Sequence, residues 1–102
     1  MLNLLLINIS EDEASSIINS LKANDPQADC LELDDYNGLK GEVADPAYWD
    51  AIILSEKPST NPTLLKAVSK DFNSIPIIFY ADNYSKQLYI NVMKHGAKDC
   101  VS

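Results

Sequence analysis

Short apolar runs alternate with amphipathic stretches along this chain. Three runs, at residues 4–7, 51–54 and 75–80, are almost continuously apolar, which is typical of strands buried on both faces of a parallel sheet. The run at 30–33 is half polar and predicts a strand at a sheet edge, and residues 99–101 begin a further strand. The pattern therefore predicts five strands.

The stretch after the first strand has the signature of a helix start. Ser10 followed by Glu13 forms a capping box, and the helix that it opens is expected to stop before Pro26. Its apolar positions recur at helical spacing and predict one buried face, made of Ala14, Ile17, Ile18 and Leu21. A short helix at residues 39–43 is also expected, although neighbouring glycines weaken it.

Two more helices are predicted in the second half of the chain. Pro62 suits the first position of one, and Gly96 suits the C-terminal cap of the other, which extends from about residue 84 to 95. The apolar positions expected to face the core are Leu64, Leu65 and Val68 in the first helix, and Leu88, Val92 and Met93 in the second. Trp49 is expected to pack at the lower edge of the sheet.

Strands that alternate with helices favour a parallel sheet with right-handed crossovers and helices on both faces. The chain has no internal repeat, linker or low-complexity tract. Its 102 residues are sufficient for one hydrophobic core. The prediction is therefore one three-layer α/β domain over residues 1–102.

Composition excludes several classes of function. The formal net charge of −7, with only eight scattered basic residues, argues against a nucleic-acid partner. Cys30 and Cys100 stand alone, without the CxxC or Cys/His spacing of a zinc or redox site. No segment has the length of a membrane span or the form of a signal peptide, so we expect a cytoplasmic protein without metal or cofactor.

Three short motifs together resemble the receiver domain of bacterial response regulators. They are WDAIIL at residues 49–54 before a loop, IPII at 75–78 and GAKD at 96–99. In order and at these spacings they cover essentially the whole chain. The resemblance implies a flavodoxin-like, doubly wound sheet with strand order 2-1-3-4-5. It also implies the chemistry of that family, in which an aspartate after the third strand accepts a phosphoryl group beside a magnesium ion.

At the positions that carry this chemistry, the sequence departs from the family. The phosphoacceptor position falls on Ser55, and the acidic pair that holds magnesium falls on Asn8 and Ile9. The switch hydroxyl and the switch aromatic fall on Ala81 and Cys100. The resemblance therefore implies a degenerate, phosphorylation-incompetent pseudo-receiver that has no catalytic residue and no metal.

The resemblance also implies partners. Receivers commonly make contacts through the fourth helix and the fifth strand, so Tyr84, Tyr89 and Lys94 are candidate interface residues, for a homodimer or another protein. The family's lysine after the fifth strand is not in this chain, and its last helix is expected to be missing. We expect the domain to regulate an output domain in a longer chain, such as the GGDEF and EAL domains of FimX-type cyclic-di-GMP proteins.

Two alternatives remain open from the sequence. A phosphorylatable receiver could use a displaced acid, either Glu56 or Asp82. If it does not, Glu56 is expected to be a solvated loop acid, with a phosphate mimic or a cation ligand shared with Glu11 as the other interpretations. A small-molecule-binding flavodoxin-like domain is disfavoured because acidic residues, and no glycine-rich phosphate loop, follow the first strand. Asn8 and Ser55 are expected either to hydrogen-bond across the strand ends or to be solvated.

Overall fold

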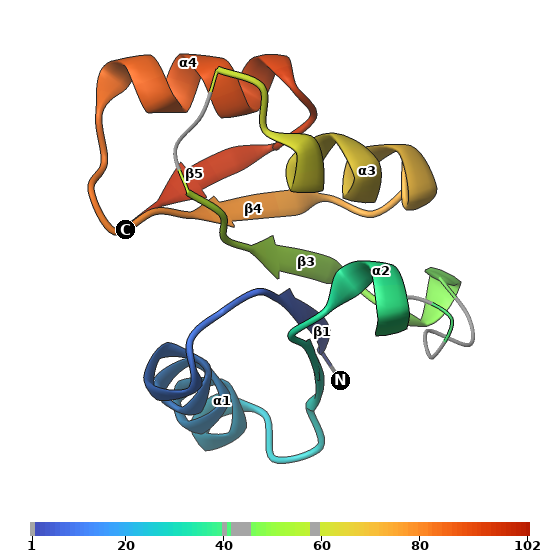
Figure 1. Cartoon of the computed structure of the whole chain (residues 1–102). Helices are drawn as coiled ribbons and strands as arrows, with labels where there is room; N and C mark the ends of the chain where they lie inside the picture. Colours follow the sequence, from blue (N-terminus) through green and yellow to red (C-terminus); the bar gives the residue numbers. More distant parts are fainter. Residues whose placement is uncertain (1, 40, 42–45, 58–59) are drawn as a thin grey trace.

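Five parallel strands form the centre of the molecule. The computed structural model describes residues 2–39, 41, 46–57 and 60–102. The strands are β1 (Asn3–Ile7), β2 (Asp29–Leu33), β3 (Ala51–Leu54), β4 (Ile77–Tyr80) and β5 (Asp99–Val101), in the spatial order β2-β1-β3-β4-β5. This is the flavodoxin-like sheet that the sequence predicted, and β2 is indeed an edge strand (Figure 1).

Helices cover the two faces of the sheet unequally. One face carries α2 (Tyr36–Leu39), α3 (Thr63–Asp71) and α4 (Lys86–Lys94), and the other carries α1 (Glu11–Asn24) (Figure 1). Alternate residues of β1 serve the two sides: Leu5 and Ile7 belong to the larger core cluster under α3 and α4, whereas Leu4 and Leu6 pack toward α1.

The face that α1 covers is left partly bare over β3, β4 and β5. Ala51, Ile53 and Tyr80 on this side are only partly buried, and Val101 at the sheet edge is 40% exposed. Parallel sheets normally have both faces covered. In the described residues the third layer of the predicted sandwich is therefore confined to the β1 side.

Side-chain caps start two of the helices. At the start of α1 the Ser10 hydroxyl accepts the Glu13 backbone N–H at 3.4 Å, which confirms Ser10 as the N-cap. The Glu13 carboxylate accepts from the Ser10 hydroxyl at 2.8 Å, whereas in a capping box it accepts from the backbone N–H of the N-cap residue. Ser85, which was not singled out in the sequence, caps α4 by accepting the Leu88 N–H at 3.1 Å. That cap fixes the helix start two residues after the predicted one.

Gly96 ends α4 in a backbone conformation that suits glycine. Its φ is +118°, and the Ala97 N–H donates to the Val92 carbonyl at 3.0 Å, which is the six-to-one bond of a Schellman motif. A Cβ on Gly96 would lie 2.7 Å from the Ser69 Cβ on α3. The cap therefore also sets how closely α3 and α4 approach.

Two expectations about element boundaries need correction. The short helix expected at 39–43 lies mostly outside the described residues, since 40, 42 and 43 are not described; just before it, one helical turn at Tyr36–Leu39 is anchored by the buried Tyr36 ring. Pro62 is the N-cap of α3 and not its first residue. The ladder of β4 begins at Ile77, two residues after the predicted start, and a 3₁₀ turn at Pro46–Tyr48 was not predicted.

Tyr36 ties α2 to the end of α3. Its hydroxyl donates to the Asp71 carboxylate at 2.6 Å, and its ring meets Phe72 edge to face with centroids 6.2 Å apart. Burial and this carboxylate raise the pKa of Tyr36 well above its usual value. Trp49 lies partly buried against the core and meets the Tyr48 ring edge to face at 4.9 Å, in agreement with its predicted packing role.

No helix in the described residues has the length and apolar character needed to cross a lipid bilayer.

We predict that Gly96→Ala lowers the free energy of unfolding by about 2 kcal/mol, because alanine is strained at positive φ and its Cβ meets Ser69. Urea denaturation would measure the loss. In a Ser69→Gly background the same change should cost less, since the steric part is relieved while the backbone strain remains. Equal losses in both backgrounds would show that the contact with α3 does not matter.

Candidate functional site

A cleft of about 240 Å³ lies at the carboxyl ends of β1, β3 and β4, where open parallel sheets place their ligands. Its lining includes three of the predicted site residues, Asn8, Ser55 and Ala81, together with the loop residues Glu56, Lys57, Asp82 and Asn83. The structure therefore brings these three positions together, as the order of the strands requires.

The other two predicted positions lie outside this cleft. Ile9 is buried with Leu4, Leu6 and Ala14 in the cluster under α1, so its side chain is part of the core. Cys100 is buried in the larger cluster on the opposite face of the sheet. Burial raises the pKa of the Cys100 thiol, so this side chain behaves as a small apolar group.

Asn8 joins three strands at the cleft. It has a φ of +58°, a left-handed conformation that asparagine tolerates better than most residues, and its N–H donates to the Leu33 carbonyl of β2 at 2.9 Å. Its side-chain amide donates to the Ser55 carbonyl at 2.8 Å. The expected hydrogen bond between the two residues is confirmed, with the backbone carbonyl of Ser55 as the acceptor.

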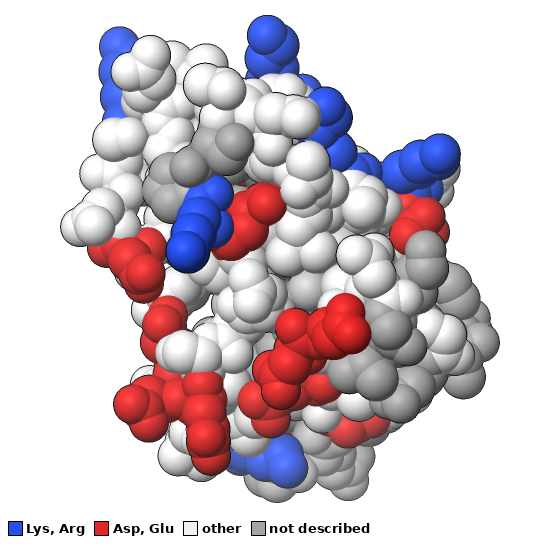
Figure 2. Space-filling view, viewed as in Figure 1, with Lys and Arg blue, Asp and Glu red and all other residues white. Residues whose placement is uncertain are grey.

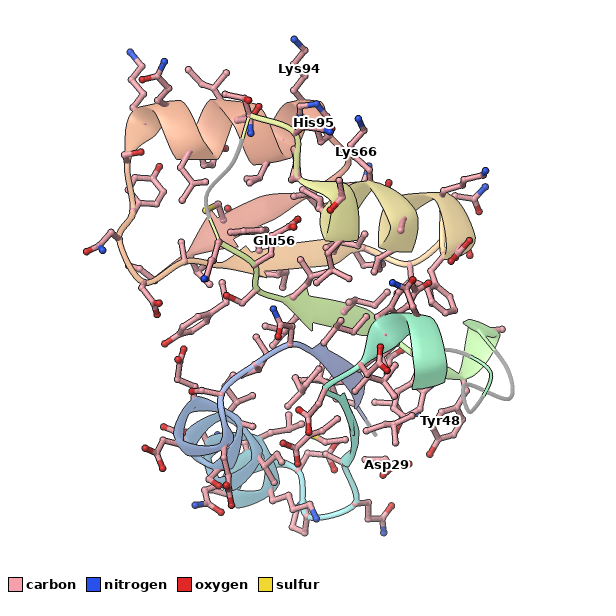
Figure 3. All side chains as sticks on the ribbon, in the orientation of Figure 1. Asp29, Tyr48, Glu56, Lys66, Lys94 and His95 are labelled. Carbon is pink, nitrogen blue, oxygen red and sulfur yellow. The ribbon has the colours of Figure 1, made fainter. Side chains whose placement is uncertain are left out.

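Glu56 has a role that the sequence did not predict. Its two carboxylate oxygens accept the backbone N–H groups of Leu64 at 3.3 Å and Leu65 at 2.9 Å, in the first turn of α3 (Figure 3). Pro62, at the N-cap position, makes no side-chain capping bond, so Glu56 supplies the cap from the preceding loop. The interpretation of Glu56 as a solvated loop acid is therefore wrong.

The residues at this site do not fit a magnesium ion. Magnesium takes oxygen ligands in octahedral geometry, usually with one or two carboxylates. Ile9 offers no oxygen, Ser55 is uncharged, and the carboxylate of Glu56 already binds α3. Asp82 is the one remaining carboxylate in the lining of the cleft, where the family has a cluster of acidic side chains. Within the described residues no group of three histidine, cysteine or acidic side chains is arranged to hold a metal.

The Glu13 carboxylate reaches from α1 to the end of β4. It lies close enough to Tyr80, the residue before Ala81, that its negative charge raises the pKa of that hydroxyl. Ala81 itself is buried, and its N–H donates to the Val101 carbonyl at 2.8 Å. The Ala81 backbone thus continues the pairing between β4 and β5.

The three candidate interface residues fall into two places. Tyr84 is 53% exposed and its ring lies 6.1 Å from that of the half-buried Tyr89. Lys94 lines a separate groove on α4 together with Thr60, from the loop before α3. The structure pairs the two tyrosines and places the lysine with other neighbours.

No family model and no curated protein matches this sequence. Thirty-six chains of solved structures match its fold, and among them are response-regulator receiver domains and CheY-like proteins.

Three of these structures illustrate the likeness. A two-component response regulator from Clostridium difficile has a TM-score of 0.76 and 17% identity, over 98% of this chain and 81% of that chain. An atypical orphan response regulator has a TM-score of 0.72 and 17% identity over 99% and 81%. A CheY-like protein from Pseudomonas aeruginosa PAO1 has a TM-score of 0.74 and 16% identity over 98% and 80%.

We predict that Glu56→Ala lowers the free energy of unfolding by about 1 kcal/mol, because two N–H groups of α3 lose their acceptors. Glu56→Gln keeps one acceptor oxygen and should lose less. Chemical denaturation would measure both variants, with Glu32→Ala on the exposed edge strand as the control for removing a carboxylate. A Glu56→Ala variant as stable as the unchanged protein would contradict the cap.

Proposed function

We propose that this domain is a non-enzymatic pseudo-receiver that regulates by binding a partner or a second copy of itself, without a phosphoryl trigger. The observation that carries this proposal is the chemistry at the end of β3. There the phosphoacceptor position is occupied by Ser55. Its side chain is neutral, and its backbone carbonyl accepts a hydrogen bond from the Asn8 amide. A serine hydroxyl cannot replace a carboxylate in forming an acyl phosphate.

The comparisons support a receiver scaffold used in this way. One structural neighbour is described as an atypical orphan regulator with a phosphorylation-independent regulatory mechanism, and another as an orphan response regulator of Helicobacter pylori. For the present domain we propose a place in the bacterial cytoplasm, joined to an output domain such as those of cyclic-di-GMP signalling proteins. The fold and the cleft are compatible with that role.

A displaced phosphoacceptor is the second candidate function. Glu56 is disfavoured because both of its carboxylate oxygens cap α3, and phosphorylation would break that cap. Asp82 lines the same cleft and caps neither of the described helices α3 and α4, so it is favoured over Glu56.

We predict that acetyl phosphate or beryllofluoride with magnesium leaves the amide NMR spectrum unchanged at Asn8, Ser55 and Ala81, because the phosphoacceptor position holds a serine and the adjacent Glu56 carboxylate already caps α3. Saturable shifts at these residues would contradict the pseudo-receiver. An acid-labile acyl phosphate that disappears in Asp82→Asn would establish the displaced acceptor. The Asp25→Asn variant, changed at the far end of α1, is the matched control.

The fourth helix and fifth strand are the proposed surface for self-association. Tyr84 is 53% exposed, and Val101 on the edge strand β5 is 40% exposed beside the bare part of the sheet face. Tyrosines and uncovered apolar side chains are frequent at the centres of interfaces.

We predict a concentration-dependent dimer in sedimentation equilibrium, weakened about fivefold or more by Tyr84→Ala and by Val101→Ala as apolar contact is lost. Leu2→Ala is the matched control, since Leu2 is exposed to almost the same degree, 39%, at the start of β1. A protein that stays monomeric up to about 1 mM would contradict the dimer. Equal weakening by Leu2→Ala would place the interface elsewhere.

A further inference from the structure

The charges of this acidic protein are separated along the chain. Residues 1–50 contain eleven of the fifteen acidic residues, whereas residues 51–102 contain six of the eight basic ones. Between residues 57 and 70, and again between 83 and 98, there are six lysines and no acidic residue. These two stretches include nearly all of α3 and all of α4, so both helices present basic side chains to solvent. Figure 2 shows lysines along the end of the molecule formed by these helices and acidic side chains over the opposite half.

A groove of about 610 Å³ opens on this basic end, between Thr60 and the outer side of α4. We name it the Thr60–α4 groove. Leu88 and Ile90 give it an apolar floor, and Ile90 is 55% exposed, which is unusual for an isoleucine on a helix. Lys94 lies at one end of the groove, and Asn91 and Gln87 offer amide groups along it.

The described residues beside Thr60 are tied to α3. Asn61, next to Thr60, accepts a hydrogen bond from the Lys66 ammonium at 2.7 Å, and Glu56 fixes the start of α3 (Figure 3). A second ammonium group is thereby kept beside the groove. Lysines at the rim and an isoleucine in the floor suit a ligand with carboxylates around an apolar anchor.

We propose that the Thr60–α4 groove binds an acidic, amphipathic segment of a partner protein, with an apolar side chain against Ile90 and carboxylates toward Lys94 and Lys66. This inference rests on the proposed partner-binding function and specifies the chemistry of one partner. A contact between the grooves of two copies is disfavoured because lysines would face lysines. A nucleic acid is disfavoured because the net charge of −7 repels phosphates and the groove floor is apolar.

The test is an NMR titration of the ¹⁵N-labelled protein with a designed amphipathic helical peptide, about 15 residues long, with a leucine stripe and glutamates elsewhere. A second peptide with lysine in place of every glutamate is the charge control. We expect saturable shifts at Thr60, Ile90 and Asn91 with the acidic peptide alone, weakening as salt is raised because the contact is electrostatic. Shifts confined to other residues, or equal binding of both peptides, would overturn the proposal.

Charge reversal at matched positions gives the second readout. Lys94→Glu should weaken binding of the acidic peptide about tenfold, whereas Lys22→Glu on α1, with the same net charge, should leave it unchanged. Equal loss in both variants would show that overall charge, and not the groove, governs binding. Displacement of the peptide by a short single-stranded oligonucleotide would overturn the protein partner in favour of a nucleic acid. Concentration-dependent shifts of the free protein, at the groove and at residues 11–13, would identify a second copy as the occupant.

These outcomes are separate from those of the phosphodonor experiment. If the peptide does not bind, the amide signals of Ser55 and Asn8 in the phosphodonor experiment are not affected. Such a failure would therefore reject the proposed groove and not the pseudo-receiver. Phosphodonor shifts at those residues would reject the pseudo-receiver while the titration still reports on the groove.

Discussion

Because all five strands run in the same direction, each of them ends at the same edge of the sheet, and the site depends on that constraint. It brings residues 8, 55 and 81 together although they are far apart in sequence. The same constraint leaves several chain ends to be held at one edge. Asn8 holds three of them, through its backbone bond to Leu33 and its side-chain bond to Ser55.

The charge of the side chains at this edge determines how the edge is stabilised. Several carboxylates placed together repel one another and require a cation or a proton to neutralise them. At this edge the Asn8 amide donates to the Ser55 carbonyl, Ala81 has no polar side chain, and the Glu56 carboxylate is stabilised by the N-terminus of α3. Asp82 is the other carboxylate in the lining of the cleft. Asn8 and Glu56 are therefore held by hydrogen bonds within the protein.

Much of the fold could be predicted because each signal was local. The apolar runs gave the strands, the Ser10–Glu13 spacing gave the start of α1, and Gly96 gave the end of α4. Contacts between distant residues could not be predicted. Glu56 caps a helix that starts seven residues later, and nothing near Glu56 in the sequence indicates this bond. The turn at Tyr36–Leu39 depends on a buried tyrosine that bonds Asp71, which is 35 residues away.

The separation of acidic and basic residues has a consequence for the rate of encounter. A molecule with most of its acidic residues in one half and most of its lysines in the other has an electric dipole, so the field of a charged partner turns it before contact. A partner that approaches the lysine-bearing helices is met in a productive orientation more often than chance would allow. The arrangement of charge thus favours fast association even where the final contact area is small.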